Sequence, residues 1–453
     1  MSIATYESAG YLNKQKKEKE NVVVNDEDEE DEDLVMYSLE DVEAWDEFRV
    51  VRGLEGVDMG HYSVGARDMC RLVAFLLAFS NYLPHESVDL YIQSHVGTPR
   101  DFERYFARAI DVLRTMNPNI TMETLDEHKI SYGQFKPALD VTFPYLFGSL
   151  GRVFDQFLYA TKDKKDSSAL TEHVNSKLLH GPQMAQLCAL LGHDQVYGKL
   201  MRLYMGSEMG YSMRSFESKV FKWAAPTLVI VSGTVVSPES DHSAMRKAFD
   251  QLIPPTRMLK GKKLTEGGLF RPGTRVVFGA VVDNPWKVSN KEAFGDGGCL
   301  LFQLSPMQDV YPPSRIKKNY AYFCNVSPGG VGFGSPPPKT VGSRTTYRCD
   351  NVSLTLEESF EYGTFRHLGG GGSFHQSMVH PQAEYEARFA ITGLEVWGYG
   401  GKDDLDEQKK KWEWEEREAQ YRQNVNIGNY EDNRALLEMA GLVGNHASSG
   451  GSV

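Results

Sequence analysis

Residues 226–236 read PTLVIVSGTVV, a run rich in β-branched residues, which favour strands over helices. Other apolar runs of strand length lie before and after it, with glycine- and proline-rich turns among them: KLMRLYM (199–205), TRVVFGAVV (274–282), CLLFQL (299–304), YAYF (320–323) and RFAITGLEVWG (388–398). Short strands separated by turn residues are typical of an antiparallel sheet. We therefore expect residues 174–401 to form a mostly antiparallel β domain.

The chain before this domain has the apolar spacing of helices. One helix is predicted to begin near Ser63, because apolar residues recur three and four positions apart at Met69, Leu72, Val73, Leu76 and Leu77. A second is predicted to begin at Thr98, since Pro99 and Asp101 follow it and suit a first helical turn. Residues 135–160 and 182–191 are also helical in spacing. Residues 34–165 are therefore expected to form an all-helical domain.

Charge is concentrated near the N-terminus. Asp26 to Asp33 are eight consecutive acidic residues in a chain of net charge −12. Residues 1–33 lack a hydrophobic period and are predicted to be a disordered charged tail. At the other end, residues 402–424 are predicted to be a charged helix and residues 425–453 a second tail. The acidic balance argues against direct nucleic-acid binding, which needs a clustered positive surface.

The sequence predicts a cytoplasmic protein without a transmembrane segment. Its longest apolar run, LVAFLLAF at 72–79, is much shorter than the roughly 20 residues that span a bilayer. Ser2 follows Met1, so the glycine required for N-myristoylation is not there. The five cysteines are far apart and include no CxxC pair, which predicts reduced thiols, mostly in the core, rather than disulfides or a zinc site.

Three motifs resemble ligand loops but lack essential residues. GHDQVYGKL from Gly192 has one residue too many for a phosphate loop and a leucine where the hydroxyl should be. GGVGFG at 329–334 is followed by three prolines, which predicts a β-turn instead of a dinucleotide loop. ETLDEHKISYGQF from Glu123 has the outline of an EF-hand loop. Leu125, His128 and Gln134 take positions three, six and twelve, so we expect a degenerate EF-hand shape that binds no calcium.

An enzyme would have to use one of two candidate sites. Cys349, beside Arg348, is the least improbable nucleophilic cysteine. His367, His375 and His380 could be imagined as metal ligands, but without HExxH spacing we interpret them as solvent-exposed loop histidines. We therefore assign no catalytic, cofactor or metal-binding residue. An antioxidant or hydrolytic enzyme that uses Cys349 or the three histidines is kept as the alternative.

The predicted C-terminal helix carries Trp412 and Trp414. Residues two apart cannot share one face of a helix, so one indole is expected to pack inward while the other is free to touch a partner. Trp412, Trp414 and Arg417 are accordingly the candidate partner-contact residues.

Several blocks of the β region, in order along about 190 residues, resemble the TLDc domain. They are GYSMRSF from Gly210, PTLVIV from Pro226, VFGA from Val277, FGDGGCLLFQLSP from Phe294, YAYF from Tyr320, GVGFG from Gly330, LTLEESFEYG from Leu354 and FAITGLEVWGYG from Phe389. The resemblance implies an α+β fold, in which an antiparallel β-sandwich has flanking helices. In these blocks Gly279, Gly332 and Gly334 suit tight turns or close backbone approach, and Trp286 and Trp397 suit the core. The acidic Glu357, Glu358 and Glu395 are interpreted as solvated side chains that could contact a partner.

The helical region, an insertion at about 232–274 and the C-terminal segment resemble more narrowly the fungal restriction of telomere capping protein 5 family. That resemblance implies a non-enzymatic protein without cofactors. It implies binding to the V1 sector of the vacuolar proton ATPase, with inhibition or disassembly of that enzyme, and a link to oxidative-stress resistance. It also implies at most peripheral association with the vacuolar membrane. A genome-maintenance adaptor acting through other proteins is a further alternative.

Overall fold

The computed structural model describes residues 59–82, 88–158, 176–196, 199–237, 243–255, 258–259, 262–263, 268–341, 344–399, 406, 410–411, 413–414 and 417–418. The chain divides into two compact units, Met1–Asp58 and Met59–Val453, and the first lies outside the described residues. The tails predicted at 1–33 and 425–453 also lie outside them, as does Trp412. Within the described residues no helix is long and apolar enough to cross a membrane.

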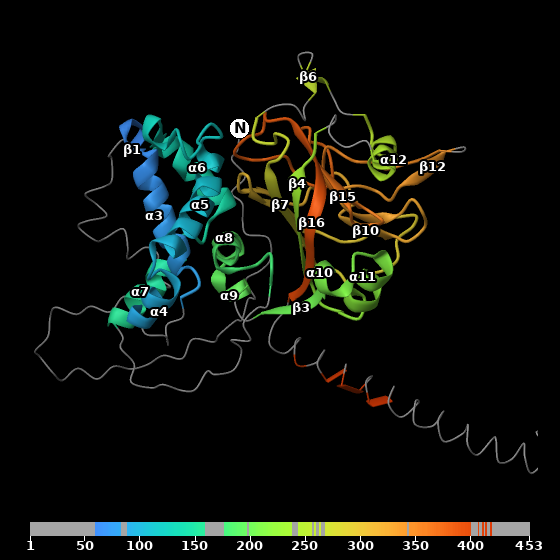
Figure 1. The fold of residues 1–453 in the computed structure, drawn as a ribbon, viewed down its shortest axis with the longest axis horizontal. Coiled ribbons are helices and arrows are strands. Elements are labelled where there is room, and N and C mark those ends of the chain that lie inside the picture. Colours follow the sequence, from blue (N-terminus) through green and yellow to red (C-terminus); the bar gives the residue numbers. More distant parts are fainter. Residues whose placement is uncertain are drawn as a thin grey trace, which may run out of the picture. The chain divides into compact units, whose positions relative to one another are not determined.

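The N-terminal part of the second unit is mostly helical (Figure 1). Its elements are η1 (Met59–His61), β1 (Ser63–Gly65), α3 (Ala66–Phe79), α4 (Val88–His95), α5 (Pro99–Met116), η2 (Leu125–Glu127), β2 (Lys129–Ser131), α6 (Tyr132–Thr142) and α7 (Gly148–Leu158). As predicted, Thr98 caps α5, and its hydroxyl accepts a hydrogen bond from the Asp101 amide at 3.3 Å. The all-helical prediction is wrong in one respect, because β1 and β2 pair as a short antiparallel ribbon. Strands of three residues are too short to show an alternating pattern.

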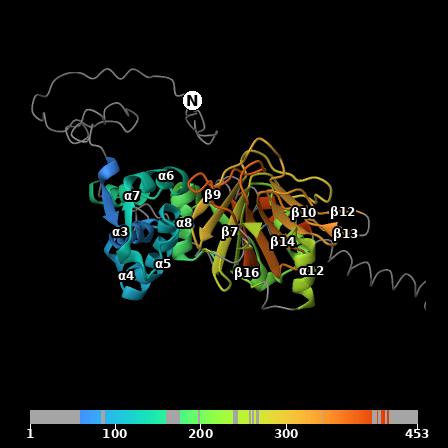
Figure 2. The same ribbon diagram turned by 90° about the horizontal axis from the view of Figure 1, so that it is seen from above.

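Helix α8 (Gly181–Leu191) is buried along almost its whole length. Its small residues, Ala185 and Ala189, belong to the core formed with α3 and α5. Its larger residues, among them Met184 and Leu187, pack on β4, β7 and β8 instead. Figure 2 shows α8 beside α5. A helix that is apolar on every side must be covered on every side, so α8 is a core element of both regions. A short helix, α9 (His193–Val196), follows it.

The rest of the described chain is built on one antiparallel sheet of ten strands. Its strands are β3 (Leu200–Met205), β4 (Thr227–Val235), β7 (Arg275–Val282), β8 (Leu300–Ser305), β9 (Asp309–Tyr311), β10 (Ala321–Cys324), β11 (Gly330–Phe333), β14 (Val352–Glu357), β15 (Tyr362–His367) and β16 (Tyr385–Tyr399). Their order is β10-β11-β14-β15-β16-β4-β7-β8-β9, and β3 also pairs with β16. The α+β prediction with a large antiparallel sheet is therefore confirmed.

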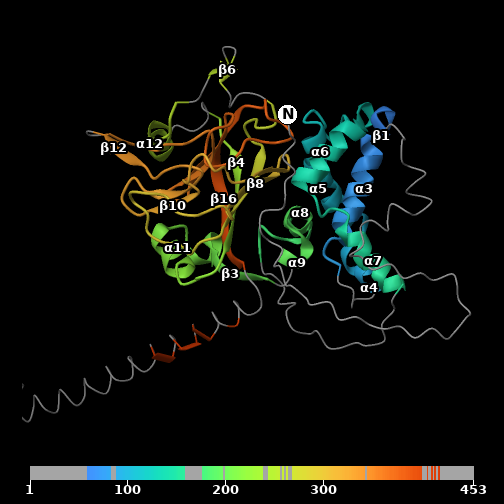
Figure 3. The same ribbon diagram turned by 180° about the vertical axis from the view of Figure 1, so that it is seen from behind.

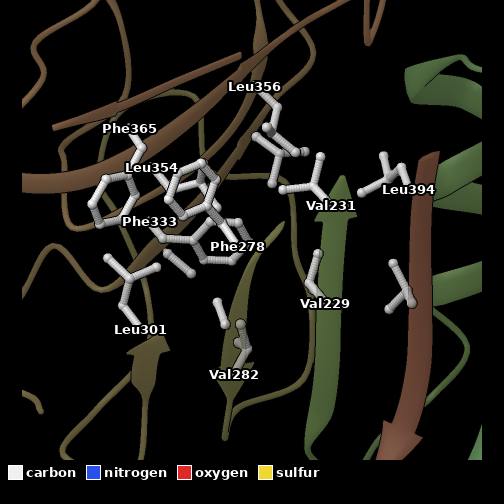
Figure 4. Close-up of a cluster of buried hydrophobic side chains, with 14 of the residues drawn as sticks. Val229, Val231, Phe278, Val282, Leu301, Phe333, Leu354, Leu356, Phe365 and Leu394 are labelled. Carbon is white, nitrogen blue, oxygen red and sulfur yellow. The ribbon is translucent and has the colours of Figure 1, made fainter. Parts of the chain in front are cut away.

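The sheet bends over its own core, so that strands several positions apart touch. Phe278 of β7 stacks on Phe365 of β15, with ring centroids 4.3 Å apart and planes 7° apart. Figure 4 shows these rings among the surrounding aliphatic side chains. The 15-residue strand β16 joins the two halves: residues 385–390 pair with β15, residues 389–398 with β4 and residues 395–399 with β3. The predicted sandwich of separate sheets is thus one continuous sheet folded over its core.

Short helices and hairpins surround this sheet (Figure 3). They are α10 (Gly206–Met209), α11 (Met213–Val220), α12 (Ala244–Leu252), the hairpin of β5 (Met258–Leu259) with β6 (Lys262–Lys263), and the hairpin of β12 (Lys339–Val341) with β13 (Arg344–Thr346). Trp286 is buried against Phe216 of α11, with ring centroids 5.1 Å apart, as expected of a core residue.

The turn predicted at 329–334 is wrong, because Gly330–Phe333 form strand β11. Gly332 is needed there because a Cβ would lie 2.2 Å from Tyr322.

Candidate functional site

The cysteine alternative is not supported by the surroundings of Cys349. Its Sγ lies 3.7 Å from the Thr355 hydroxyl, and burial raises the pKa of the thiol above its usual value. Burial also raises the pKa of Cys70 to about 12 and that of Cys299 to about 11. All five cysteines are free, and Cys349 is the least buried of them. A thiol that stays protonated at neutral pH is a poor nucleophile, so these residues have the character of structural cysteines.

The prediction that all three histidines are solvent-exposed loop residues is wrong for two of them. His375 is exposed, but His367 lies on β15 and is fully buried, and His380 is half-buried. The Ser377 amide donates to Nε2 of His367 at 2.8 Å, while Nδ1 donates to the Ala383 carbonyl at 2.6 Å. Burial lowers the pKa of His367 to about 4, so the ring is neutral and both of its nitrogens are occupied. Across the described residues, no three His, Cys, Asp or Glu side chains are grouped as metal ligands.

All three acidic residues considered as partner contacts accept hydrogen bonds within the protein, and Glu395, which is buried, was wrongly interpreted as a solvated side chain. Glu395 is 1% exposed and accepts hydrogen bonds from the Lys177 and Leu178 amides, the Ser176 hydroxyl and the indole of Trp397. Glu357 is half-buried and accepts from the amides of Ser359 and Glu361 in the turn after β14 and from the amide of Tyr362 at the start of β15. Glu358 accepts from the Ser327 hydroxyl and the Gly329 amide at 2.9 and 2.8 Å.

Replacement of Glu395 by glutamine is expected to loosen the segment that leads into α8. The amide nitrogen of glutamine would face a donor, such as the Trp397 indole, and leave it without an acceptor. We expect a loss of about 1–3 kcal/mol in the free energy of unfolding and faster proteolysis near Lys177. Urea denaturation and limited trypsin digestion measure the two effects. The exposed Glu292→Gln is the matched control, and equal results for both variants would contradict the prediction.

The segment with the outline of an EF-hand loop uses its residues for packing and capping. Leu125, at the third position, is fully buried, so its side chain belongs to the core. Gln134, at the twelfth, accepts a hydrogen bond from the Ser131 amide at 3.0 Å and completes a capping box at the start of α6. Val64 pairs with Ile130 in the β1–β2 ribbon. The side chains at these positions therefore stabilise helix ends and core.

Of the three predicted partner contacts, the structure describes two. Trp414 is 59% exposed and lies in helical backbone. Arg417, also helical and exposed, donates a hydrogen bond to the Glu413 carbonyl at 3.1 Å. An indole this exposed is available for contact with another molecule.

Sequence reasoning missed a buried polar contact between α5 and the turn that joins β8 to β9. The backbone amide of Gln308 donates to the backbone carbonyl of Asp111 at 2.9 Å, and the backbone carbonyl of Gln308 accepts from the Thr115 hydroxyl. Arg114 donates to the Pro306 carbonyl at 3.0 Å, and His380 donates through Nε2 to the Thr115 carbonyl at 2.6 Å. We call these residues the α5 seam: Asp111, Arg114, Thr115, Pro306, Gln308 and His380. The one available signal was Asp111, a charged residue between Ile110 and Val112 on an apolar helix face.

Comparison with known proteins agrees with this fold. The TLDc domain profile matches residues 173–400, which include α8 and every strand of the large sheet. The restriction of telomere capping protein 5 of Komagataella phaffii is 36% identical over 413 residues, covering 90% of this chain and 70% of its own length. This chain is a TLDc protein of that family. The protein of the same name from Kluyveromyces lactis is 35% identical over 416 residues, with 89% and 72% covered, and that from Lachancea thermotolerans is 37% identical over 361 residues, with 79% and 64% covered.

Proposed function

We propose that this TLDc protein is a non-catalytic regulator that binds the V1 sector of the vacuolar proton ATPase and inhibits that enzyme or promotes its disassembly. Its family membership is the observation that carries the proposal, since the TLDc domain is a module of protein–protein interaction. The internal use of Cys349, His367 and Glu395 also supports a non-catalytic role. The proposal includes a role in oxidative-stress resistance and an indirect influence on telomere capping, the process named in the relatives.

Regulation of this kind follows from differential binding. A protein that binds the separated or inhibited V1 sector more tightly than the assembled enzyme shifts the population toward the bound state. We place this protein in the cytoplasm and, when it is bound to its partner, at the vacuolar surface. Trp412, Trp414 and Arg417 are proposed to contribute contacts from the C-terminal helix, in addition to the TLDc domain of residues 174–401.

We also propose that the helical domain, residues 34–165, is a degenerate EF-hand-like module that does not bind calcium. The pairing of Val64 with Ile130 supports this, because two EF-hand loops are joined by such a short ribbon. The buried Leu125 and the helix-capping Gln134 support the absence of calcium. Isothermal titration with calcium is expected to give no binding heat, and micromolar binding would contradict the proposal.

The test of the proposed function is to mix the full chain with purified V1 and with intact V-ATPase. We expect co-sedimentation with V1, together with slower ATP hydrolysis or release of V1 from the membrane sector. The full chain is required because α8 shares its core with α3 and α5, and a fragment beginning at residue 174 would expose Ala185 and Ala189. Absence of binding would refute the V1 proposal.

The contribution of the C-terminal helix is tested by Trp414→Ala. Loss of a well-packed indole costs at least about 2 kcal/mol at an interface hot spot, so V1 affinity should fall on the order of 30-fold. Leu90→Ala in α4 removes another apolar side chain, 66% exposed, and is the matched control. If Trp414→Ala and Leu90→Ala bind V1 equally well, Trp414 is not a contact residue.

A further inference from the structure

Asp309 is a carboxylate buried without a cation. It is the first residue of β9, is fully buried, and directly follows Gln308 of the α5 seam. Its Oδ1 accepts a hydrogen bond from the Val310 amide at 2.8 Å, whereas Oδ2 makes no hydrogen bond of good geometry among the described residues. Burial raises the pKa of this carboxylate by more than the nearby hydroxyls of Ser377 and Tyr311 lower it. An ionised carboxylate in such surroundings is costly, so burial favours the protonated acid.

The groups that face Asp309 offer no compensating positive charge. From β9 and β16 come Tyr311 and Tyr385, whose hydroxyls lie 2.5 Å apart, and from β8 comes the amide of Gln303. From β15 comes the neutral ring of His367. Tyr311 and Tyr385 both have pKa values raised by burial first and by Asp309 second, so they stay uncharged.

The other elements that pack nearby also leave this charge unbalanced. Arg108 and Arg114 of α5 pair with Asp111, at 2.8 and 3.3 Å. On α6, Lys136 pairs with Asp140, both half exposed, and Tyr132 is exposed as well. Helix α8 has no charged residue. Arg108, Arg114 and Lys136 are therefore already matched to other carboxylates.

Asp309 is connected to the seam on two sides. Through the chain it adjoins Gln308, whose amide and carbonyl both bond to α5. On the other side lies the Ser377 hydroxyl, which interacts with the Asp309 carboxylate. This hydroxyl accepts a hydrogen bond from the backbone amide of His380 at 2.9 Å, and the His380 ring donates to the Thr115 carbonyl. That last bond needs only a proton on Nε2, which both the neutral tautomer and the imidazolium supply. Water that reached Asp309 from this side would have to separate the contacts of the seam.

We propose that the α5 seam is a proton-controlled contact, closed while Asp309 carries a proton and loosened when Asp309 is ionised. Ionisation places an unpaired charge next to Gln308, and that charge is relieved only when the turn between β8 and β9 moves toward water. Ionisation of Asp111, on the opposite side of the seam, also loosens the contact. Its effect is weaker because Arg108 and Arg114 partly balance the charge of Asp111. This inference does not depend on the identity of the protein's partner.

The sign of the pH dependence follows from the raised pKa values. Burial raises the pKa of Asp309 to about 7 and that of Asp111 to about 6, against about 3.8 for both when they are exposed to water. The closed seam therefore retains protons that the open seam releases, and acid favours the closed form. Between about pH 6 and about pH 7.5 the open fraction should rise on the order of ten-fold, and above that range the curve should level off.

Hydrogen exchange of the full chain tests the proposal, because the Gln308 amide bonds across the seam. After correction for the intrinsic exchange rate, protection of Gln308 should fall on the order of ten-fold between about pH 6 and about pH 7.5. The amides of β10, at the other end of the strand order, serve as internal reference. In Asp309→Asn, which is neutral at every pH, most of this fall should disappear, leaving only the weaker contribution of Asp111, and protection should stay close to the acidic wild-type level. Asp350→Asn, which alters a carboxylate that pairs with Lys317 at 2.7 Å, is the control and should retain the fall.

Two results would overturn the proposal: protection of Gln308 in the wild type that does not change with pH, or the same pH dependence in wild type and Asp309→Asn. Should the Asn variant fail to fold, infrared spectroscopy of the wild type decides. A carboxylic acid carbonyl band should be present at about pH 6 and vanish with a midpoint near pH 7. Absence of such a band at about pH 6 would show that Asp309 is already ionised and would refute the mechanism.

Discussion

Replacement of Phe278 by alanine is expected to lower the free energy of unfolding by about 3–5 kcal/mol, as for other fully buried aromatic residues. The Phe278 ring is completely buried on β7 and lies against Phe365 and Phe389, with centroids 4.3 and 5.4 Å away. Because these rings come from β15 and β16, the substitution removes contacts between the two halves of the bent sheet. The measurement is urea denaturation of the full chain, followed by tryptophan fluorescence.

Phe154→Ala is the matched control, since Phe154 is 57% exposed on α7. Its free energy of unfolding should stay within about 0.5 kcal/mol of the wild type. A loss below about 1 kcal/mol in Phe278→Ala would mean that the sheet closes without this stack.

Replacement of Glu386 by alanine is expected to cost a similar amount, about 3–5 kcal/mol, for an electrostatic reason. Glu386 is fully buried and accepts from Arg366 at 2.9 Å and from Arg388 at 2.8 Å. Without it, Arg366 would be left without its carboxylate partner and Arg388 would retain only Asp250, at 2.7 Å. Removal of one partner leaves a buried guanidinium unpaired, which costs more free energy than replacement of both partners by apolar residues.

The same substitution should also loosen α12. Arg388 and Arg366 donate to the carbonyls of Pro254 and Pro255, just after this helix, and Asp250 of α12 pairs with Arg246 at 2.8 Å. Urea denaturation gives the global loss, and proteolysis within residues 243–255 gives the local one. Asp140→Ala, which breaks a half-exposed pair with Lys136, is the control and should change little. Equal stability of Glu386→Ala and Asp140→Ala would contradict the argument.

Local sequence determined those helices and strands whose type and boundaries depend on only a few neighbouring residues. The β-branched run at 226–236 became β4, and Thr98, Pro99 and Asp101 set the start of α5, because both preferences act within a few residues of chain. The burial of Trp286 and Trp397 was predicted as well. The order of the blocks along 210–400 was sufficient to indicate the family, since block order is a property of the sequence alone.

The tertiary structure alone decided which polar residues are internal. Thr115 and Gln308 are 193 positions apart, and Glu395 holds amides 217 and 218 positions before it. No local pattern contains such pairs, so His367 and Glu395 had the same appearance in the sequence as exposed residues. The charge state of Asp309 is the extreme case. An aspartate is ordinarily ionised, and only the surrounding strands, by excluding water and offering no cation, favour its proton.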